Sequence, residues 1–196
     1  AGWNSFMTAK SSGGLVDMGK AKRLDRSVEK RPGSAGMYSL KAFSTEIIGV
    51  TANGNVTTGR VNMGSTNASD PSNHNFTDRE SAGFNLPFTA IPDSMVVWVK
   101  YVPKNKADKG QLKAVLHGDH ATKDPGTNMN EAVAVAVVNP ESNNGEWIRY
   151  SVAFDKTGCG SKDPRYMLAS ITTNKVSGGG GAEIYVDDIL FVYAPV

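Results

Sequence analysis

Residues 131–138 read EAVAVAVV, and the choice between helix and strand for this stretch decides the fold class. Ala and Glu favour helix, and no other segment of the chain has comparable helix propensity. The alternation of Ala and Val is strict, however, and the flanking pairs MN and NP are typical of turns. We therefore predict a strand here, which leaves nothing longer than a turn as helix.

Outward from this stretch, the other apolar segments are short, rich in Val, Ile and aromatic residues, and separated by clusters of Gly, Asn, Pro and Asp. This pattern is typical of an all-β domain. We predict strands at 36–44, 55–63, 94–102, 111–118, 131–138, 147–154, 166–173 and 182–193. Strands punctuated in this way favour a two-sheet sandwich.

The connections carry further predictions. An Asn-Gly pair in ANGN (52–55) predicts a hairpin turn between β-type runs. The segment 64–92 is a long polar loop, and such loops are usually functional or packed by their own aromatic residues. The first 35 residues read as an irregular leading edge. Because neither a repeat nor a shift in composition divides the chain, we predict one domain over 1–196.

Composition excludes several classes of function. Of the 196 residues, 39% are hydrophobic and 20% are charged, which suits a soluble domain with a substantial core. A formal charge of +2 is far from the basic stripe that nucleic-acid binding needs. The single cysteine, Cys159, rules out an internal disulfide. We find no apolar run near the roughly 18 residues of a membrane span, no signal peptide in AGWNSF, and no nucleotide-binding or hydrolase motif.

Along three predicted strands, alternate side chains face opposite sides of the sheet. One row is apolar and is expected to face the core; we call the other row of each strand its open row. The open rows hold Trp98 and Lys100, then Lys113, Val115 and His117, then Trp147, Arg149 and Ser151. Aromatic faces stack on sugar rings, and Arg and Lys donate hydrogen bonds to hydroxyls or carboxylates. If the rows share one concave sheet, they form a saccharide-binding surface. The alternative is that loop 64–92 covers them, leaving the two Trp residues as a second hydrophobic layer.

The segment HGDHATKDP (117–125) concentrates polar residues. Its two histidines, His117 and His120, are spaced for a helical metal site, but Gly118 follows a strand here. A strand end followed by a solvated loop is therefore the preferred interpretation. By alternation we expect His117 on the same side as Trp98 and Arg149, with Asp119 at the rim of a sugar site.

Acidic residues suggest two further roles. Paired carboxylates are typical of glycosidases, and Asp93, Asp119, Asp124 and Glu131 are candidates, although no catalytic residue can be assigned. Alternation in the last strand directs either Asp187 or Asp188 inward, where a carboxylate needs a partner. The partner is either a structural calcium ion bound by Asp187 or hydrogen-bond donors around an Asp at a β-bulge.

Several segments together resemble one family. GWNSF, RPGSAGMYSLKAFS, TANGNVTTGRVNMGS, PDSMVVWVKYVP, LHGD followed by DP, YMLASITTNK and IYVDDILFVY, in that order, resemble the putative carbohydrate metabolism domain. The resemblance implies a two-sheet jelly-roll β-sandwich, similar to carbohydrate-binding modules and galactose-binding-like domains. It also implies a secreted or cell-surface protein of gut bacteria, with an immunoglobulin-like domain preceding this one. By analogy with jelly-roll sugar-binding modules, Asp187 resembles a calcium ligand.

Three functional hypotheses follow. The leading one is a non-catalytic module that binds a poly- or oligosaccharide through Trp98, Lys100, His117, Asp119, Trp147 and Arg149. The second is a glycoside hydrolase or polysaccharide lyase that uses Asp119 or Glu131 with His117 or Tyr101, the lyase acting on an anionic glycan. The third is a structural or adhesive spacer whose open face is fully covered by loops.

Overall fold

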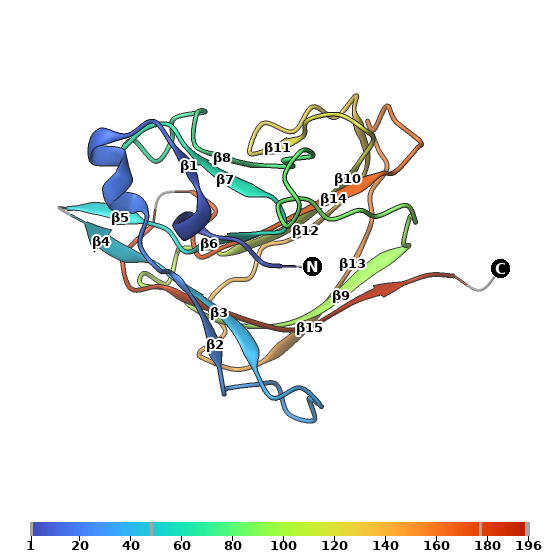
Figure 1. Ribbon diagram of the computed structural model, residues 1–196. Coiled ribbons are helices and arrows are strands. Elements are labelled where there is room, and N and C mark those ends of the chain that lie inside the picture. Colours follow the sequence, from blue (N-terminus) through green and yellow to red (C-terminus); the bar gives the residue numbers. More distant parts are fainter. Residues whose placement is uncertain (1, 48, 177, 195–196) are drawn as a thin grey trace.

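Three layers of β-sheet make up the computed structural model, which describes residues 2–47, 49–176 and 178–194 (Figure 1). The first layer is a five-stranded sheet in the order β13 (Ile148–Ala153), β9 (Ser94–Val102), β15 (Glu183–Val192), β3 (Ser39–Phe43) and β2 (Leu24–Ser27). The central layer is a four-stranded sheet in the order β12 (Ala132–Val138), β10 (Gln111–His117), β14 (Tyr166–Thr172) and β6 (Asn55–Thr57). A smaller outer sheet has the order β1 (Lys10–Ser11), β7 (Arg60–Met63), β8 (His74–Phe76) and β11 (Lys123–Asp124). A hairpin of β4 (Thr45–Ile47) and β5 (Val50–Ala52) and two 3-10 helices, η1 (Phe6–Thr8) and η2 (Gly14–Gly19), complete the elements.

The predicted all-β jelly-roll sandwich is confirmed. EAVAVAVV (131–138) contains β12, which runs antiparallel to β10. From β12 onward, consecutive strands alternate between the central and the five-stranded sheet, so the chain crosses the sandwich at each step. This crossing is the connectivity of a jelly roll.

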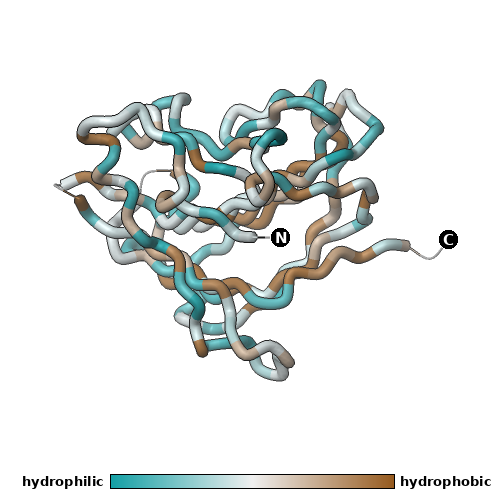
Figure 2. Tube along the Cα trace, in the orientation of Figure 1, coloured by the Kyte–Doolittle hydropathy of each residue, from teal (hydrophilic) through white to brown (hydrophobic). Residues whose placement is uncertain are grey.

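The core lies between the two large sheets, where the alternating rows meet. Met95, Val97, Val99 and Tyr101 of β9 are buried as predicted, and the apolar row of β10 is buried opposite them. Figure 2 shows hydrophobic segments along the strands that face each other. The hydroxyl of Tyr101 donates a hydrogen bond to the carbonyl of Thr173 (2.7 Å), and burial raises its pKa. The ring therefore stays neutral and fixed within the core.

The predicted strand 55–63 is wrong, because the chain leaves one sheet for another midway. β6 pairs with β14 in the central sheet, and β7 pairs with β8 in the outer sheet. The break falls at Gly59, where an added Cβ would lie 2.2 Å from the carbonyl oxygen of Phe76. Such a close approach of two backbones requires glycine.

The hairpin predicted at ANGN is also wrong. β5 pairs with β4, and β6 pairs with β14, so the strands on either side of ANGN do not pair with each other. Gly54 serves instead to bring two backbones together, since an added Cβ would lie 2.7 Å from the amide nitrogen of Phe43. The Asn-Gly pair therefore marks a change of sheet.

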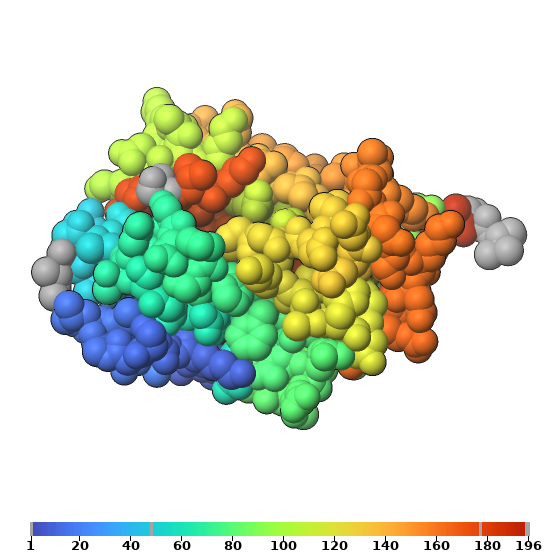
Figure 3. All heavy atoms as spheres, turned by 90° about the horizontal axis from the view of Figure 1, so that it is seen from above, coloured from blue at the N-terminus to red at the C-terminus, as the bar shows by residue number. Residues whose placement is uncertain are grey.

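The outer sheet was not predicted, and it lies against the outer side of the central sheet (Figure 1). Figure 3 shows the molecule from this side, with blue, green and yellow segments at the surface. The contacts between the two sheets include buried polar ones. Asp124 of β11 accepts a hydrogen bond from Lys113 Nζ at 2.6 Å, and Asn75 of β8 donates one to Ser170 Oγ at 2.9 Å. The open row of β10 is thus a buried interlayer surface. β1 and β2 lie within the first 35 residues and β8 lies within 64–92, so neither segment is wholly irregular.

Among the residues that the structure describes, no helix has the length and hydrophobicity to cross a membrane.

Candidate functional site

The outer face of the five-stranded sheet brings together part of the predicted glycan-binding set. Strand pairing places Arg149 of β13 beside Trp98 of β9, and Lys100 of β9 opposite Tyr185 of β15. Trp98 and Lys100 are half-buried, while Arg149 is exposed. We call the outward side chains of Trp98, Lys100, Trp147, Arg149 and Tyr185 the aromatic face.

Tyr185 lies at the centre of this face. Its ring meets Trp147 edge-on, with 6.5 Å between ring centroids. The ammonium nitrogens of Lys41 and Lys100 lie 5.2 and 5.1 Å from the same ring, within the range of cation–π attraction. The Tyr185 hydroxyl donates a hydrogen bond to Glu183 Oε2 at 2.7 Å. Tyr185 itself is only 5% exposed, so these contacts fix a buried ring beneath the half-buried Trp147.

The lysines of the aromatic face have carboxylate partners within the chain. Lys41 Nζ lies 2.5 Å from Glu183 Oε1, and Lys100 forms an ion pair with Glu29. Burial raises the pKa of Glu183, but hydrogen bonds from Lys41 and Tyr185 outweigh it and lower the pKa overall. The Lys/Arg bias that suggested an anionic glycan is therefore largely neutralised. Among the described residues, Arg149 has no carboxylate within ion-pair distance.

A loop between β2 and β3, residues 28–38, covers part of the aromatic face. The guanidinium of Arg31 lies 5.2 Å from the Trp98 ring, and its Nε lies 2.6 Å from Asp188 Oδ2. Loop 64–92, the alternative cover for the open rows, reaches only the row of β10, because its β8 lies in the outer sheet and Thr77 contacts His117 there. Because Arg149 stays exposed, the face is not fully covered, contrary to what a spacer domain would require.

Asp187 lies at a β-bulge in β15. Its carboxylate accepts backbone hydrogen bonds from Asp188 (2.9 Å) and Arg31 (3.1 Å), and the pairing register with β9 shifts just after it. Asp188 has a positive φ of 47°, which the bulge imposes. The hydrogen-bonded alternative is thus what the structure shows. Calcium binding by Asp187 stays a prediction.

The expectation that His117 and Trp98 share one surface is wrong. β10, which carries His117, belongs to the central sheet, while β9 belongs to the five-stranded sheet. Since both residues point away from the core, they face opposite sides of the sandwich. His117 is 0% exposed beneath the outer sheet, and Tyr101 is equally buried in the core. Neither side chain is accessible to a glycan in this structure, so their roles as ligand or acid–base residue stay predictions without structural support.

His117 instead fastens the outer sheet to the central one. Its Nε2 is 2.8 Å from Thr77 Oγ1, and its Nδ1 is 2.9 Å from the carbonyl of Gly118. Because a carbonyl only accepts, the proton lies on Nδ1 and the Thr77 hydroxyl donates to Nε2. Burial, reinforced by His120 and Arg79, lowers the pKa of His117 to about 4. The ring is therefore neutral near pH 7.

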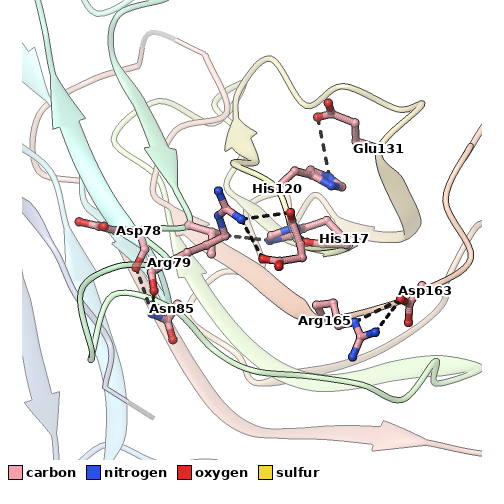
Figure 4. Close-up of polar contacts among 11 residues, drawn as sticks. Asp78, Arg79, Asn85, His117, His120, Glu131, Asp163 and Arg165 are labelled. Carbon is pink, nitrogen blue, oxygen red and sulfur yellow. Dashed lines mark hydrogen bonds and ion pairs between the residues drawn. The ribbon is translucent and has the colours of Figure 1, made fainter.

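The rim after β10 carries the other polar residues of the segment (Figure 4). Asp119 is exposed and accepts a hydrogen bond from Arg79 Nη1 at 2.8 Å. His120 Nε2 lies 3.8 Å from Glu131 Oε2. Within residues 2–47, 49–176 and 178–194, no three His, Cys, Asp or Glu side chains are grouped to hold a metal. Asp119 therefore lies at a rim, as predicted, but not at the rim of the aromatic face.

Sequence reasoning missed Tyr185, Lys41 and Arg31. Alternation in AEIYVDDILFVY places Tyr185 outward, opposite the buried Ile184, so a signal for it exists in the sequence. Nothing local indicates that Arg31, more than 60 residues away along the chain, folds over Trp98.

No protein-family model and no curated protein matches the chain. Among solved structures, a "putative glycoside hydrolase" from Bacteroides thetaiotaomicron matches with a TM-score of 0.65 at 15% identity, over 99% of this chain and 63% of that protein. The chain thus spans less than two thirds of that protein. A second, from Bacteroides vulgatus, matches with a TM-score of 0.59 at 16% identity, over 87% of this chain and 77% of that one. At these identities the likeness supports the β-sandwich fold alone.

Proposed function

We propose that the chain is a glycan-binding module of a carbohydrate-active protein, with its ligand lying across the aromatic face. The observation that carries this proposal is the pair of half-buried rings, Trp98 and Trp147, on one outward face, with the exposed Arg149 beside them. The buried Tyr185 supports Trp147 from below. Sugar rings stack on such aromatic faces, and the surrounding charges can hydrogen-bond to hydroxyls. Two Bacteroides proteins, each described as a "putative glycoside hydrolase", share the fold. A secreted or surface setting, which the family resemblance implies, is part of the proposal.

A neutral glycan fits this face better than an anionic one. Lys41 and Lys100 are each neutralised by a carboxylate, so a uronate would have to compete with Glu183 and Glu29 for them. A hydroxyl group needs no such displacement, because it can share a hydrogen bond with an ion pair.

The experiment is a glycan array followed by titration calorimetry of any hit. Trp147→Ala and Arg149→Ala should weaken binding by about tenfold or more, as expected when a stacking ring or charged donor is lost. Arg165→Ala is the matched control, since that exposed arginine pairs with Asp163 elsewhere on the protein. A hit whose affinity is unchanged by both aromatic-face variants would refute the proposal.

A glycoside hydrolase is the second candidate, favoured by the description of the two Bacteroides structures. Its carboxylates are the exposed Asp119 and the half-buried Glu131, at the rim of the central sheet. Release of reducing ends from a polysaccharide panel, lost in Glu131→Gln, would support it. Activity that persists in both Glu131→Gln and Asp119→Asn would exclude this rim as the site.

A further inference from the structure

A cavity of about 370 Å³ lies between the two large sheets, on the opposite side of the five-stranded sheet from the aromatic face. Both sheets line it with apolar side chains, among them Leu40 and Phe191 on one side and Ala114, Met167 and Ala169 on the other. Pockets that bind small molecules typically begin at about 300 Å³ and are mostly apolar. The cavity therefore has the size and lining of a ligand site.

The cavity exists because the sheets separate beside the bulge of β15. β3 pairs with β15 only as far as Leu40 and Val186, so beyond that point β15 has lost one neighbour. Ile189 and Phe191 face the core, yet both remain half-buried. Inward-facing residues that keep contact with solvent mark an open mouth.

Polar groups inside the cavity are already bonded to the protein. The hydroxyl of Thr58 donates to the carbonyl of Met167 at 3.0 Å and accepts from the amide of Ala169 at 2.9 Å. Lys113 bonds Asp124 on the far side of its sheet. A ligand bound in the cavity would therefore have few hydrogen-bond partners there, which favours an uncharged apolar group.

The mouth has a different character. Trp3 and Tyr38 line the cavity and are partly exposed, Tyr38 at 47%. Their indole N–H and hydroxyl make no hydrogen bond to another described residue, so both can bond a polar group outside. Asp187 and Asp188 also line the cavity, and both contact Arg31, which lies over Trp98. The mouth therefore adjoins the aromatic face.

We propose that this cavity binds the aliphatic or aryl chain of an amphiphilic glycoside, with the sugar at the mouth beside Trp3 and Tyr38. The apolar chain enters the space between the sheets, where the hydrophobic effect stabilises it. An engineered apolar cavity of about 150 Å³ already admits benzene. The larger space here accommodates a substituted ring or an alkyl chain of medium length. This site is separate from the aromatic face and does not require glycan binding there.

The test uses Nile red, an uncharged apolar dye, and measures its fluorescence on titration with the protein. We expect a blue-shifted emission that saturates at one site. Displacement by n-octyl β-D-glucoside, but not by methyl β-D-glucoside at the same concentration, would show that the alkyl chain is what binds. Absence of the blue shift, or equal displacement by both glycosides, would overturn the proposal.

Variants locate the dye. Ala169→Phe fills the cavity and should weaken Nile red binding by about tenfold or more. Ala82→Phe, in an exposed turn, makes the same change outside the cavity and should bind as the wild type does. If circular dichroism shows that Ala169→Phe is unfolded, the smaller Ala169→Val replaces it, with a smaller loss expected. Wild-type affinity in the folded variant would place the dye elsewhere and overturn the proposal.

One further variant separates this proposal from glycan binding on the aromatic face. Trp98→Ala should lose glycan binding and keep Nile red binding, because Trp98 does not line the cavity. Loss of Nile red binding in the folded Trp98→Ala protein would count against the cavity as the site.

Discussion

Acidification from pH 7 to pH 5 is expected to weaken the fold through His117. Burial, together with His120 and Arg79, lowers its pKa to about 4 in the folded protein, against about 6.5 in the unfolded chain. Between these values the unfolded chain binds more protons, so the contribution of His117 to stability is complete above about pH 6.5 and is lost as the pH falls toward 4. Integrated from pH 7 to pH 5, this single group lowers the free energy of unfolding by about 2 kcal/mol.

The assay is urea unfolding followed by tryptophan fluorescence at both pH values. His117→Gln keeps an acceptor for the Thr77 hydroxyl but cannot take up a proton, so its pH dependence should be smaller than that of the wild type by about 2 kcal/mol. His74→Gln, in the outer sheet, controls for the loss of a histidine as such. If His117→Gln and wild type lose the same stability between the two pH values, the ring is not held neutral as the structure indicates.

Three further outcomes are expected. Asp124→Ala removes the carboxylate partner of the largely buried Lys113 ammonium, and urea melts should show a loss of about 3 kcal/mol; a loss near zero would mean that the amine is solvated. Gly54→Ala places a methyl group 2.7 Å from the amide nitrogen of Phe43 and should cost about 1–3 kcal/mol, seen as a lower melting temperature. If Asp187 holds calcium, melting temperatures measured with calcium should exceed those with chelator by mass action; identical curves would remove Asp187 as a ligand.

The sequence predicts which side chains of each long strand face the core. In β9 and β10 the predicted core rows are buried throughout, as Val97 and Leu116 show, and Trp98 points outward as predicted. This succeeds because the two-residue period is a local property of the strand. Val115 and His117 of the other row of β10 are buried too, because the outer sheet lies over them. Because the period is only local, the prediction that His117 and Trp98 share one surface fails. Alternation cannot tell which sheet a strand joins, and β9 and β10, neighbours in sequence, lie in different sheets.

The outer sheet shows a second limit of prediction from the sequence. β1 and β11 have two residues each, and β8 has three, so no period can be read from them. They are held by pairing with distant strands and by buried polar contacts such as Lys113 with Asp124. HGDHATKDP therefore reads as a strand end followed by a solvated loop, whereas His117 and Asp124 are buried and join two layers of the fold.

Arg31 over Trp98 has a consequence for affinity. A glycan that stacks on Trp98 has to displace the guanidinium, so only the fraction of molecules with this loop open can bind there. If one molecule in about ten is open, the measured dissociation constant is about tenfold above the intrinsic one. Under the proposed function, a single module would therefore bind weakly, and several modules on one polysaccharide would bind more tightly together.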